Sequence, residues 1–171
     1  MHINKKVIVL LIVIFSLTLI VFFGYKRTSR SYDKEMPSDF NFFAKVEYDT
    51  YLLDTYNNTL TKKFDWEHDT IISFEIGQEF KEKIYNTLCD IDIYKYPENY
   101  APTSTITVDP STSYFLKFTF NSDTTEINWT EHTYSEKKEA KKLREIFETI
   151  YEYLEQDDRV KSLPEDRRAF L

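Results

Sequence analysis

The sequence predicts an α+β fold: an N-terminal transmembrane helix followed by one domain, in which an antiparallel sheet of strand hairpins packs against two helices. Three observations lead to this prediction. Residues 7–23 carry no charge. Several short segments after residue 40 alternate apolar and polar side chains, as half-buried strands do. Two later segments repeat apolar residues at helical spacing, and the order of strands, helix, two strands and helix is typical of an α+β sandwich.

The uncharged run at residues 7–23, VIVLLIVIFSLTLIVFF, is long enough to span a bilayer. At about 1.5 Å per helical residue it measures roughly 25 Å, and the two residues after it bring it close to the ~30 Å hydrocarbon core. Bulky aromatic residues at its end suit a signal peptidase poorly, and Ser16-Leu17-Thr18, which has the size pattern of a cleavage site, lies deep inside the run; a cleaved signal peptide is the alternative. Because the only cysteine is Cys89, a lipoprotein cleavage site is also missing. We therefore predict an uncleaved signal anchor over residues 7–25 that holds the chain in the lipid bilayer.

The other segments are arranged around this anchor. We expect a cytoplasmic head at 1–6, a linker at 26–39, an extracytoplasmic α+β domain at 40–156 and a polar surface tail at 157–171. Basic residues flank the anchor almost equally, so the positive-inside rule does not decide the orientation. A short head before a long folded portion usually stays inside. The predicted location is the cell membrane, in a single pass, with the C-terminal domain outside the cytoplasm.

The composition excludes several classes of function. Residues 28–171 hold 18 basic and 29 acidic residues, a net charge of −11. Phosphate repels such a body, so we expect no nucleic-acid partner. The chain has only two glycines, Gly24 and Gly77. Phosphate-binding loops and dinucleotide folds need several glycines where backbone amides approach the phosphate, so we expect no nucleotide and no cofactor.

The domain is predicted to begin with a strand and a hairpin. The first strand has one face formed by alternate residues, Phe42, Ala44, Val46 and Tyr48. Residues 51–64 follow as a hairpin that turns at Asn57 and Asn58. Asparagine tolerates the left-handed backbone that tight turns need, and here it replaces the missing glycine.

A further strand and the first helix come next. TIISFEI, residues 70–76, alternates again, with Ile72, Phe74 and Ile76 on one face. GQEFKEKIYNTLCDI, residues 77–91, changes to helical spacing, with an apolar stripe of Phe80, Ile84, Leu88 and Ile91. Cys89 lies on the flank of this stripe, and we interpret it as small buried filler. The alternative is a nucleophile served by a histidine base.

A second hairpin and the last helix complete the domain. YFLKFTF (114–120) and TTEINW (124–129) flank the turn NSD. Their predicted inward face consists of Tyr114, Leu116, Phe118, Phe120, Thr125, Ile127 and Trp129. The last helix is predicted to begin near Thr133, with Glu136 completing a capping box and Ser135 as a rival cap. Its buried stripe is Ala140, Leu143, Phe147, Ile150 and Leu154.

Between the first helix and the second hairpin, residues 92–113 are predicted to form a long loop. The segment contains three prolines, which favour extended backbone at the preceding residues. Loops of this length tend to be functional or disordered. Tyr94, Tyr96 and Tyr100 lie on this segment and are our candidates for contact with a ligand or partner. The alternative is that their rings fold back and cover the edge of the core.

Two histidines each follow a tryptophan, in WEHD (66–69) and WTEH (129–132). Together with nearby carboxylates they could supply nitrogen and oxygen ligands to a metal; the candidate ligands are His68, Asp69, Glu131 and His132, with Asp65 and Glu67 beside them. The pattern lacks the helical histidine spacing of zinc proteases and the cysteine pairs of structural zinc sites. We therefore predict no metal site and no catalytic residue, with the His68/His132 region as the alternative.

Several segments occur in an order that carries a resemblance: KEKIYNTLCDIDIYKYPENYAP, the PSTSYFLKFTFN…TEINW hairpin, SEKKEAKKLREIFETI and KSLPE. Over roughly residues 75–165 the chain resembles a group of small uncharacterised proteins that are membrane-anchored or lipid-anchored on the surface of Gram-positive bacteria. Members of that group usually end in a glycine-rich segment after LP, whereas this chain continues EDRRAFL. The resemblance implies the location and the fold, and it implies no activity.

The expected function is a non-enzymatic interaction or sensing module, anchored in the membrane and facing outward, whose partner is an unknown protein or surface ligand. One alternative is a hydrolase or metal-dependent enzyme that uses the His68/His132 region. The other is a structural partner of a larger membrane complex.

Overall fold

The computed structural model describes residues 35–46, 50–101, 106–134 and 137–168, with the backbone alone for 106–111 and 131–134. These residues belong to one compact unit, Lys34–Leu171. The described part forms a seven-stranded sheet in the order β4-β3-β2-β1-β6-β7-β5. The strands are β1 (Asn41–Val46), β2 (Tyr51–Asp54), β3 (Thr59–Lys63), β4 (Asp69–Ser73), β5 (Asn99–Tyr100), β6 (Ile106–Phe120) and β7 (Asp123–Tyr134).

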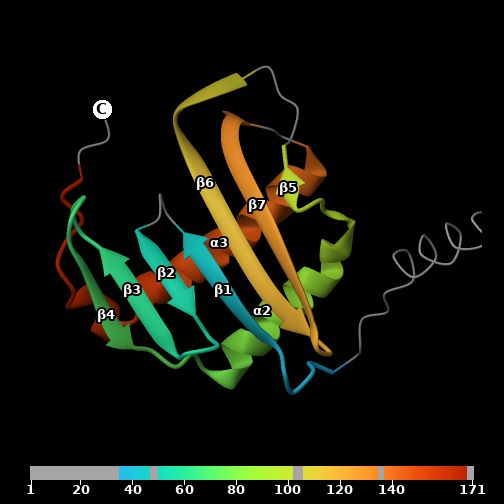
Figure 1. The fold of residues 1–171 in the computed structure, drawn as a ribbon, viewed down its shortest axis with the longest axis horizontal. Coiled ribbons are helices and arrows are strands. Elements are labelled where there is room, and N and C mark those ends of the chain that lie inside the picture. The colour runs from blue at the N-terminus through green and yellow to red at the C-terminus, as the bar shows by residue number, and fades with distance from the viewer. Residues whose placement is uncertain (1–34, 47–49, 102–105, 135–136, 169–171) are drawn as a thin grey trace, which may run out of the picture. The chain divides into compact units, whose positions relative to one another are not determined.

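The helices of the described part lie on one side of this sheet. They are α2 (Gln78–Asp90), α3 (Lys138–Gln156) and the short α4 (Asp158–Lys161), with a 3-10 turn η1 (Ile93–Lys95) after α2. Figure 1 shows α2 and α3 running across one face of the sheet, while none of the described helices lies on the other face. The predicted α+β class and its two main helices are therefore confirmed.

The prediction of a wholly antiparallel sheet is wrong. β5 pairs with β7 in parallel, with Tyr100 beside Trp129, and the sheet is mixed. All other neighbouring strands in the described part are antiparallel. After α2 and η1, the chain adds β5 to the edge of the sheet beside β7. The β6–β7 hairpin comes next in the sequence, and β5 runs in the same direction as β7.

The first strand and the first hairpin follow their alternation. Phe42, Ala44 and Val46 are almost fully buried, as predicted. Tyr48 lies outside the described residues. The turn between β2 and β3 contains Asn58 at φ 51°, the left-handed conformation expected for that position.

β4 ends earlier than its alternation predicts. The strand stops at Ser73, although Phe74 and Ile76 are buried. The N–H of Phe74 donates to the carbonyl of Asn58 at 2.8 Å, and the chain then turns away towards Gly77, the residue before α2. Ile72, the third predicted inward residue, is half-buried, because β4 is at the edge of the sheet.

Residues 92–113 do not form the long loop that was predicted. The segment contains η1, β5 and the first part of β6, with residues 102–105 outside the described set. The β6–β7 register shifts between Thr107 and Thr112, and Pro110 lies inside that irregularity. A proline lacks the N–H that a regular ladder needs, so a break in the ladder can accommodate it.

The second hairpin turns as predicted. Asn121 and Ser122 both have positive φ, 49° and 65°, as in the tight turns that suit twisted strands. Leu116, Phe118 and Trp129 are almost fully buried on its inner face. The predicted inward face of this hairpin is therefore confirmed.

The predicted start of the last helix is wrong. Thr133 is paired with Thr107 in β7, and α3 begins at Lys138 without a side-chain cap. Ser135 and Glu136 lie outside the described residues. Pairing with β6 keeps residues near Thr133 extended, and this long-range interaction competes with the local capping pattern. The predicted stripe of α3 is buried throughout: Ala140, Leu143, Phe147, Ile150 and Leu154.

Among the described residues, no helix has the length and apolar character needed to cross a membrane. The predicted anchor at 7–25 lies outside those residues and stays a prediction.

Candidate functional site

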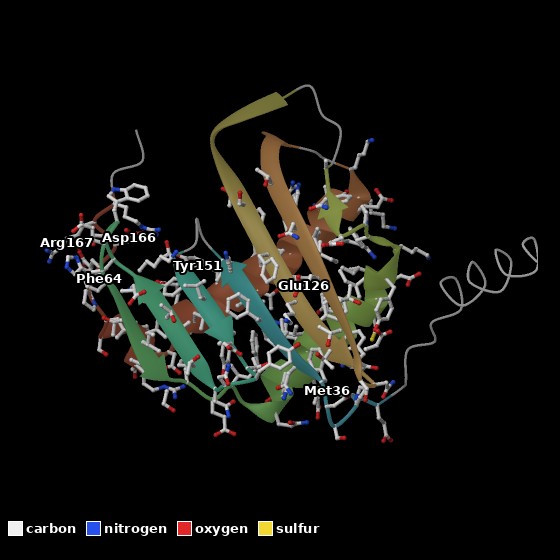
Figure 2. The ribbon with its side chains drawn as sticks, in the orientation of Figure 1. Met36, Phe64, Glu126, Tyr151, Asp166 and Arg167 are labelled. Atoms are coloured by element: carbon white, nitrogen blue, oxygen red, sulfur yellow. The ribbon has the colours of Figure 1, made fainter. Side chains whose placement is uncertain are left out.

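A depression of about 230 Å³ lies where the β3–β4 loop meets the C-terminal segment. Its lining residues are Lys63, Asp65, Trp66, Glu67, His68, Asp69 and Arg168. We call these residues, together with Phe64, Asp166 and Arg167, the Trp66 corner. Figure 2 labels Phe64, Asp166 and Arg167 at this corner of the sheet.

The β3–β4 loop orders itself through Asp65. Its carboxylate accepts the backbone N–H groups of Glu67 at 2.8 Å and His68 at 2.7 Å, and it lies 2.9 Å from His68 Nδ1. Aspartate commonly forms such turns with the backbone that follows it. These bonds lower the pKa of Asp65, and the bond from the Glu67 N–H contributes most. The Phe64 ring stacks on His68, with 6.1 Å between the ring centres, so the loop has a fixed shape without glycine.

The C-terminal segment is attached to this loop. The N–H of Arg167 donates to the carbonyl of Phe64 at 2.7 Å. Arg168, only 9% exposed, donates from Nε to Asp166 Oδ1 at 2.9 Å and from its terminal nitrogen to Asp166 Oδ2 at 2.6 Å. Thr50 completes the group, because it accepts from Arg168 and donates to Asp166 Oδ2 at 3.1 Å. The predicted surface tail therefore packs against the start of β2, and α4 also buries Val160.

The electrostatics of this group favour the ionised carboxylate. The hydrogen bonds from Arg168 lower the pKa of Asp166 to about 2, with help from the Thr50 hydroxyl. A bidentate pair between a guanidinium and a carboxylate combines charge with fixed geometry. Asp166 thus holds Arg168 in one orientation across the corner.

Trp66 lies above this fixed group with 71% of its surface exposed. The guanidinium carbon of Arg168 is 5.9 Å from the centre of its ring, within the range of a cation–π interaction. Glu67 and Asp69 are exposed beside it. The corner therefore presents a large aromatic surface next to carboxylates, on a loop whose backbone is hydrogen-bonded in place.

A second polar group lies near the corner under the inner face of the sheet. The hydroxyl of Tyr51, which is 2% exposed, donates to Glu155 on α3. Burial and this bond raise the pKa of Tyr51. The Lys62 ammonium lies 5.5 Å from the centre of the Tyr51 ring. These contacts join β2 and β3 to α3 below the corner.

The four candidate metal ligands are not brought together. His68 lies in the β3–β4 loop and Asp69 begins β4, whereas Glu131 and His132 belong to β7. Four strands separate β4 from β7, and at about 4.8 Å per strand spacing the two strands are roughly 24 Å apart. Among the described residues, no group of three or more histidine, cysteine or carboxylate side chains could hold a metal ion.

The three candidate tyrosines lie near the opposite end of the sheet from the Trp66 corner, against the core. The Tyr94 ring is 5.9 Å from that of Phe118, and the Tyr100 ring is 6.0 Å from that of Trp129. Tyr96 donates its hydroxyl to the carbonyl of Glu139 at 2.9 Å, and burial raises its pKa to about 12. Their rings fold back on the core edge, which was the alternative interpretation. A role in ligand contact stays a prediction.

Two further side chains complete the description of the core. Cys89 is half-buried on α2, not fully buried as expected for filler. The Nε1 atom of Trp129 is buried without a hydrogen-bond partner in the described part of the chain. Sequence reasoning missed Arg168 and Asp166 altogether. Their D-x-R spacing permits a local ion pair, but nothing in it indicates contact with Trp66.

Comparisons with models of known protein families, with curated proteins and with solved structures give no match. Function must therefore be inferred from the chemistry of these residues.

Proposed function

We propose that this chain is a membrane-anchored, extracytoplasmic interaction or sensing module without catalytic activity, and that it contacts its partner through the Trp66 corner. The observation that carries the proposal is the 71% exposure of Trp66 on an ordered loop. Exposed tryptophan is uncommon on a free surface, and tryptophan and arginine are enriched where proteins bind one another. Trp66 and Arg168 occur together here.

Preorganisation of the corner supports binding. Asp65 holds the loop from within, and Arg167 ties it to the C-terminal segment. A surface that is already ordered loses less conformational freedom when a partner binds. Such a surface suits recognition, since affinity depends on fixed anchors more than on area.

Two features of the sequence support the proposed location. The uncharged run at 7–23 favours an anchor, and the resemblance to surface proteins of Gram-positive bacteria favours an outward-facing domain. The uncharged run and the resemblance also fit the alternative function, in which the chain is a structural partner of a larger membrane complex. That role would use the same corner for a permanent contact instead of a reversible one.

The enzymatic alternative has one observation in its favour. His68 Nδ1 lies 2.9 Å from both carboxylate oxygens of Asp65, an arrangement that can orient a general base. However, the residues that line the depression include no serine, threonine or cysteine. His132, its proposed companion, is on a distant strand. Stoichiometric metal in purified protein, lost in His68→Ala, would favour this alternative over ours.

Site-specific photo-cross-linking in native membranes tests the proposal. A benzophenone amino acid replaces Trp66 in one variant of the full chain and Lys83, an exposed residue of α2, in a matched control. We expect a discrete cross-linked species at position 66 that is missing at position 83. The absence of any product at position 66, or equal products at both positions, contradicts a contact at the corner.

A further inference from the structure

The charges that line the depression are unevenly matched. The lining has two permanent cations and three carboxylates: Lys63 and Arg168 against Asp65, Glu67 and Asp69. Arg168 is already paired with Asp166 at 2.6 Å, and Lys63 lies opposite Asp69 in the β3–β4 ladder. Arg167, the third cation of the Trp66 corner, does not line the depression. A partner that enters the depression therefore meets an excess of negative charge.

The unmatched carboxylate lies next to Trp66. Glu67 follows Trp66 in the loop, and both residues are exposed. In the described part of the chain, the Glu67 carboxylate has no hydrogen bond or ion pair, whereas Asp65 accepts bonds from within the loop. The N–H of Glu67 donates to Asp65 at 2.8 Å, so the backbone that carries this carboxylate is held in place. An exposed indole and an unpaired carboxylate thus adjoin on an ordered loop.

The indole favours the same ligand charge as the carboxylate. The face of a tryptophan ring attracts cations more strongly than that of any other side chain. The corner already contains one such contact, between Arg168 and Trp66 at 5.9 Å. Because Asp166 neutralises Arg168, this contact leaves the depression with its negative charge. A cation from a partner would therefore be attracted by Trp66 and Glu67 together.

The size of the depression suits a side chain of a larger partner. Its volume is about 230 Å³. Sites for whole small molecules usually measure about 300–1,000 Å³ and enclose most of the ligand. Trp66, at 71% exposure, instead stands out from the surface. A long side chain can reach into the depression while the rest of the partner covers Trp66.

We infer that the partner is a basic protein segment, and that one of its lysine or arginine side chains stacks on Trp66 and pairs with Glu67. This inference rests on the proposed function and specifies the chemistry of the partner. Residues 28–171 have a net charge of −11, which attracts a basic segment from a distance. An acidic protein or an anionic lipid surface is repelled by the same charges.

Calorimetric titration of the full chain, in micelles of an uncharged detergent, tests the charge of the partner. The probe is a hexalysine peptide, and its control is the same peptide with every lysine side chain acetylated, which removes the charge. We expect hexalysine to bind, with an affinity that falls as salt screens the attraction. We expect no binding of the acetylated peptide or of hexaglutamate. Equal affinities for hexalysine and either control overturn the inference, and so does an affinity that salt leaves unchanged.

A pair of carboxylate variants shows where the peptide binds. Glu67→Gln should weaken hexalysine binding by about two- to fivefold, as expected for the loss of one exposed ion pair. Glu148→Gln is the matched control, because Glu148 is an exposed carboxylate of α3, away from the corner. It should leave the affinity almost unchanged. Equal effects of the two substitutions would mean that the acidic surface as a whole attracts the peptide, which overturns a contact at Glu67.

A pair of variants at Trp66 tests the role of its ring. Trp66→Leu keeps an apolar side chain but removes the aromatic face, and should weaken hexalysine binding by at least about tenfold. Trp66→Phe keeps an aromatic face and should weaken it less. Equal affinities of these two variants contradict stacking of a cation on the ring. Circular dichroism of each variant shows that the fold is intact, so that a loss of binding is assigned to the corner.

The cross-linking experiment at position 66 separates this inference from the proposed function. A discrete cross-linked species in membranes, together with no binding of hexalysine, would overturn the basic partner and leave the proposed contact at the corner in place. The absence of any cross-linked species at position 66 would contradict the proposed function, and this inference with it.

Discussion

Arg168 places its guanidinium carbon 5.9 Å from the centre of the Trp66 ring, although one belongs to the C-terminal segment and the other to a loop between two strands. The contact depends on Asp166, which holds Arg168 through paired hydrogen bonds. It links a structural ion pair to the most exposed aromatic side chain of the corner. The stability and the accessibility of this corner can therefore be tested separately.

Arg168→Ala should destabilise the fold. The side chain is buried, and its loss removes the paired guanidinium donors of the Asp166 carboxylate and the donor to the Thr50 hydroxyl. An unsatisfied buried partner typically costs about 1–3 kcal/mol in the free energy of unfolding. Urea denaturation of residues 34–171 measures the change. Lys161→Ala removes an exposed pair with Asp158 and should change the stability by less than about 0.5 kcal/mol, so similar losses would contradict this role for Arg168.

Asp166 should make stability depend on pH in acid. Its folded pKa, about 2, lies below the ordinary value of 3.8. A lowered folded pKa contributes stability that is present above the ordinary value and is lost as the pH falls towards the folded value. Denaturation midpoints of wild type and Asp166→Asn should therefore differ near pH 6 and converge between pH 4 and 2. A constant difference across this range would show that the charge of Asp166 contributes nothing.

The two tryptophans should respond differently to a soluble quencher. Trp66 is 71% exposed and Trp129 is 1% exposed. Iodide should quench the fluorescence of Trp129→Phe, in which only Trp66 emits, and should hardly affect Trp66→Phe. Similar quenching in both variants would mean that Trp66 is covered or that Trp129 is open.

The core should depend on α3. Phe147 is 3% exposed, and its ring centre lies 4.7 Å from that of Tyr114. Phe147→Ala leaves a cavity and should cost about 3–5 kcal/mol. Cys89→Ser should cost less, because Cys89 is only half-buried.

A fragment that ends at Glu131 lacks α3 and should show no cooperative thermal transition by circular dichroism. A cooperative transition would mean that the core is wrongly placed.

Local patterns were sufficient for the inner faces of the sheet and helices. Alternation identified Phe42, Ala44 and Val46, and helical spacing identified the stripe of α3, because both depend on neighbours within one element. The turn at Asn57 and Asn58 was also local. These features follow from the side-chain periodicity of strands and helices.

Long-range pairing accounts for what local patterns missed. Thr133 matches a helix cap, but it pairs with Thr107 in a long hairpin. Tyr100 joins a parallel pair that no nearby residue indicates. The Trp66 corner forms because Arg167 bonds to Phe64, residues that are distant in sequence. The sequence contained the polar D-x-R segment but no sign of where it would pack.

The most direct test of the proposed module is surface labelling of residue 66 on intact cells. The full chain carries Trp66→Cys in a Cys89→Ser background, and a membrane-impermeant maleimide is added outside the cells. We expect labelled protein in the membrane pellet after a carbonate wash, with no further increase after the cells are permeabilised. Labelling only after permeabilisation, or labelled protein in the soluble fraction, would contradict a membrane-anchored domain that presents this corner outside the cytoplasm.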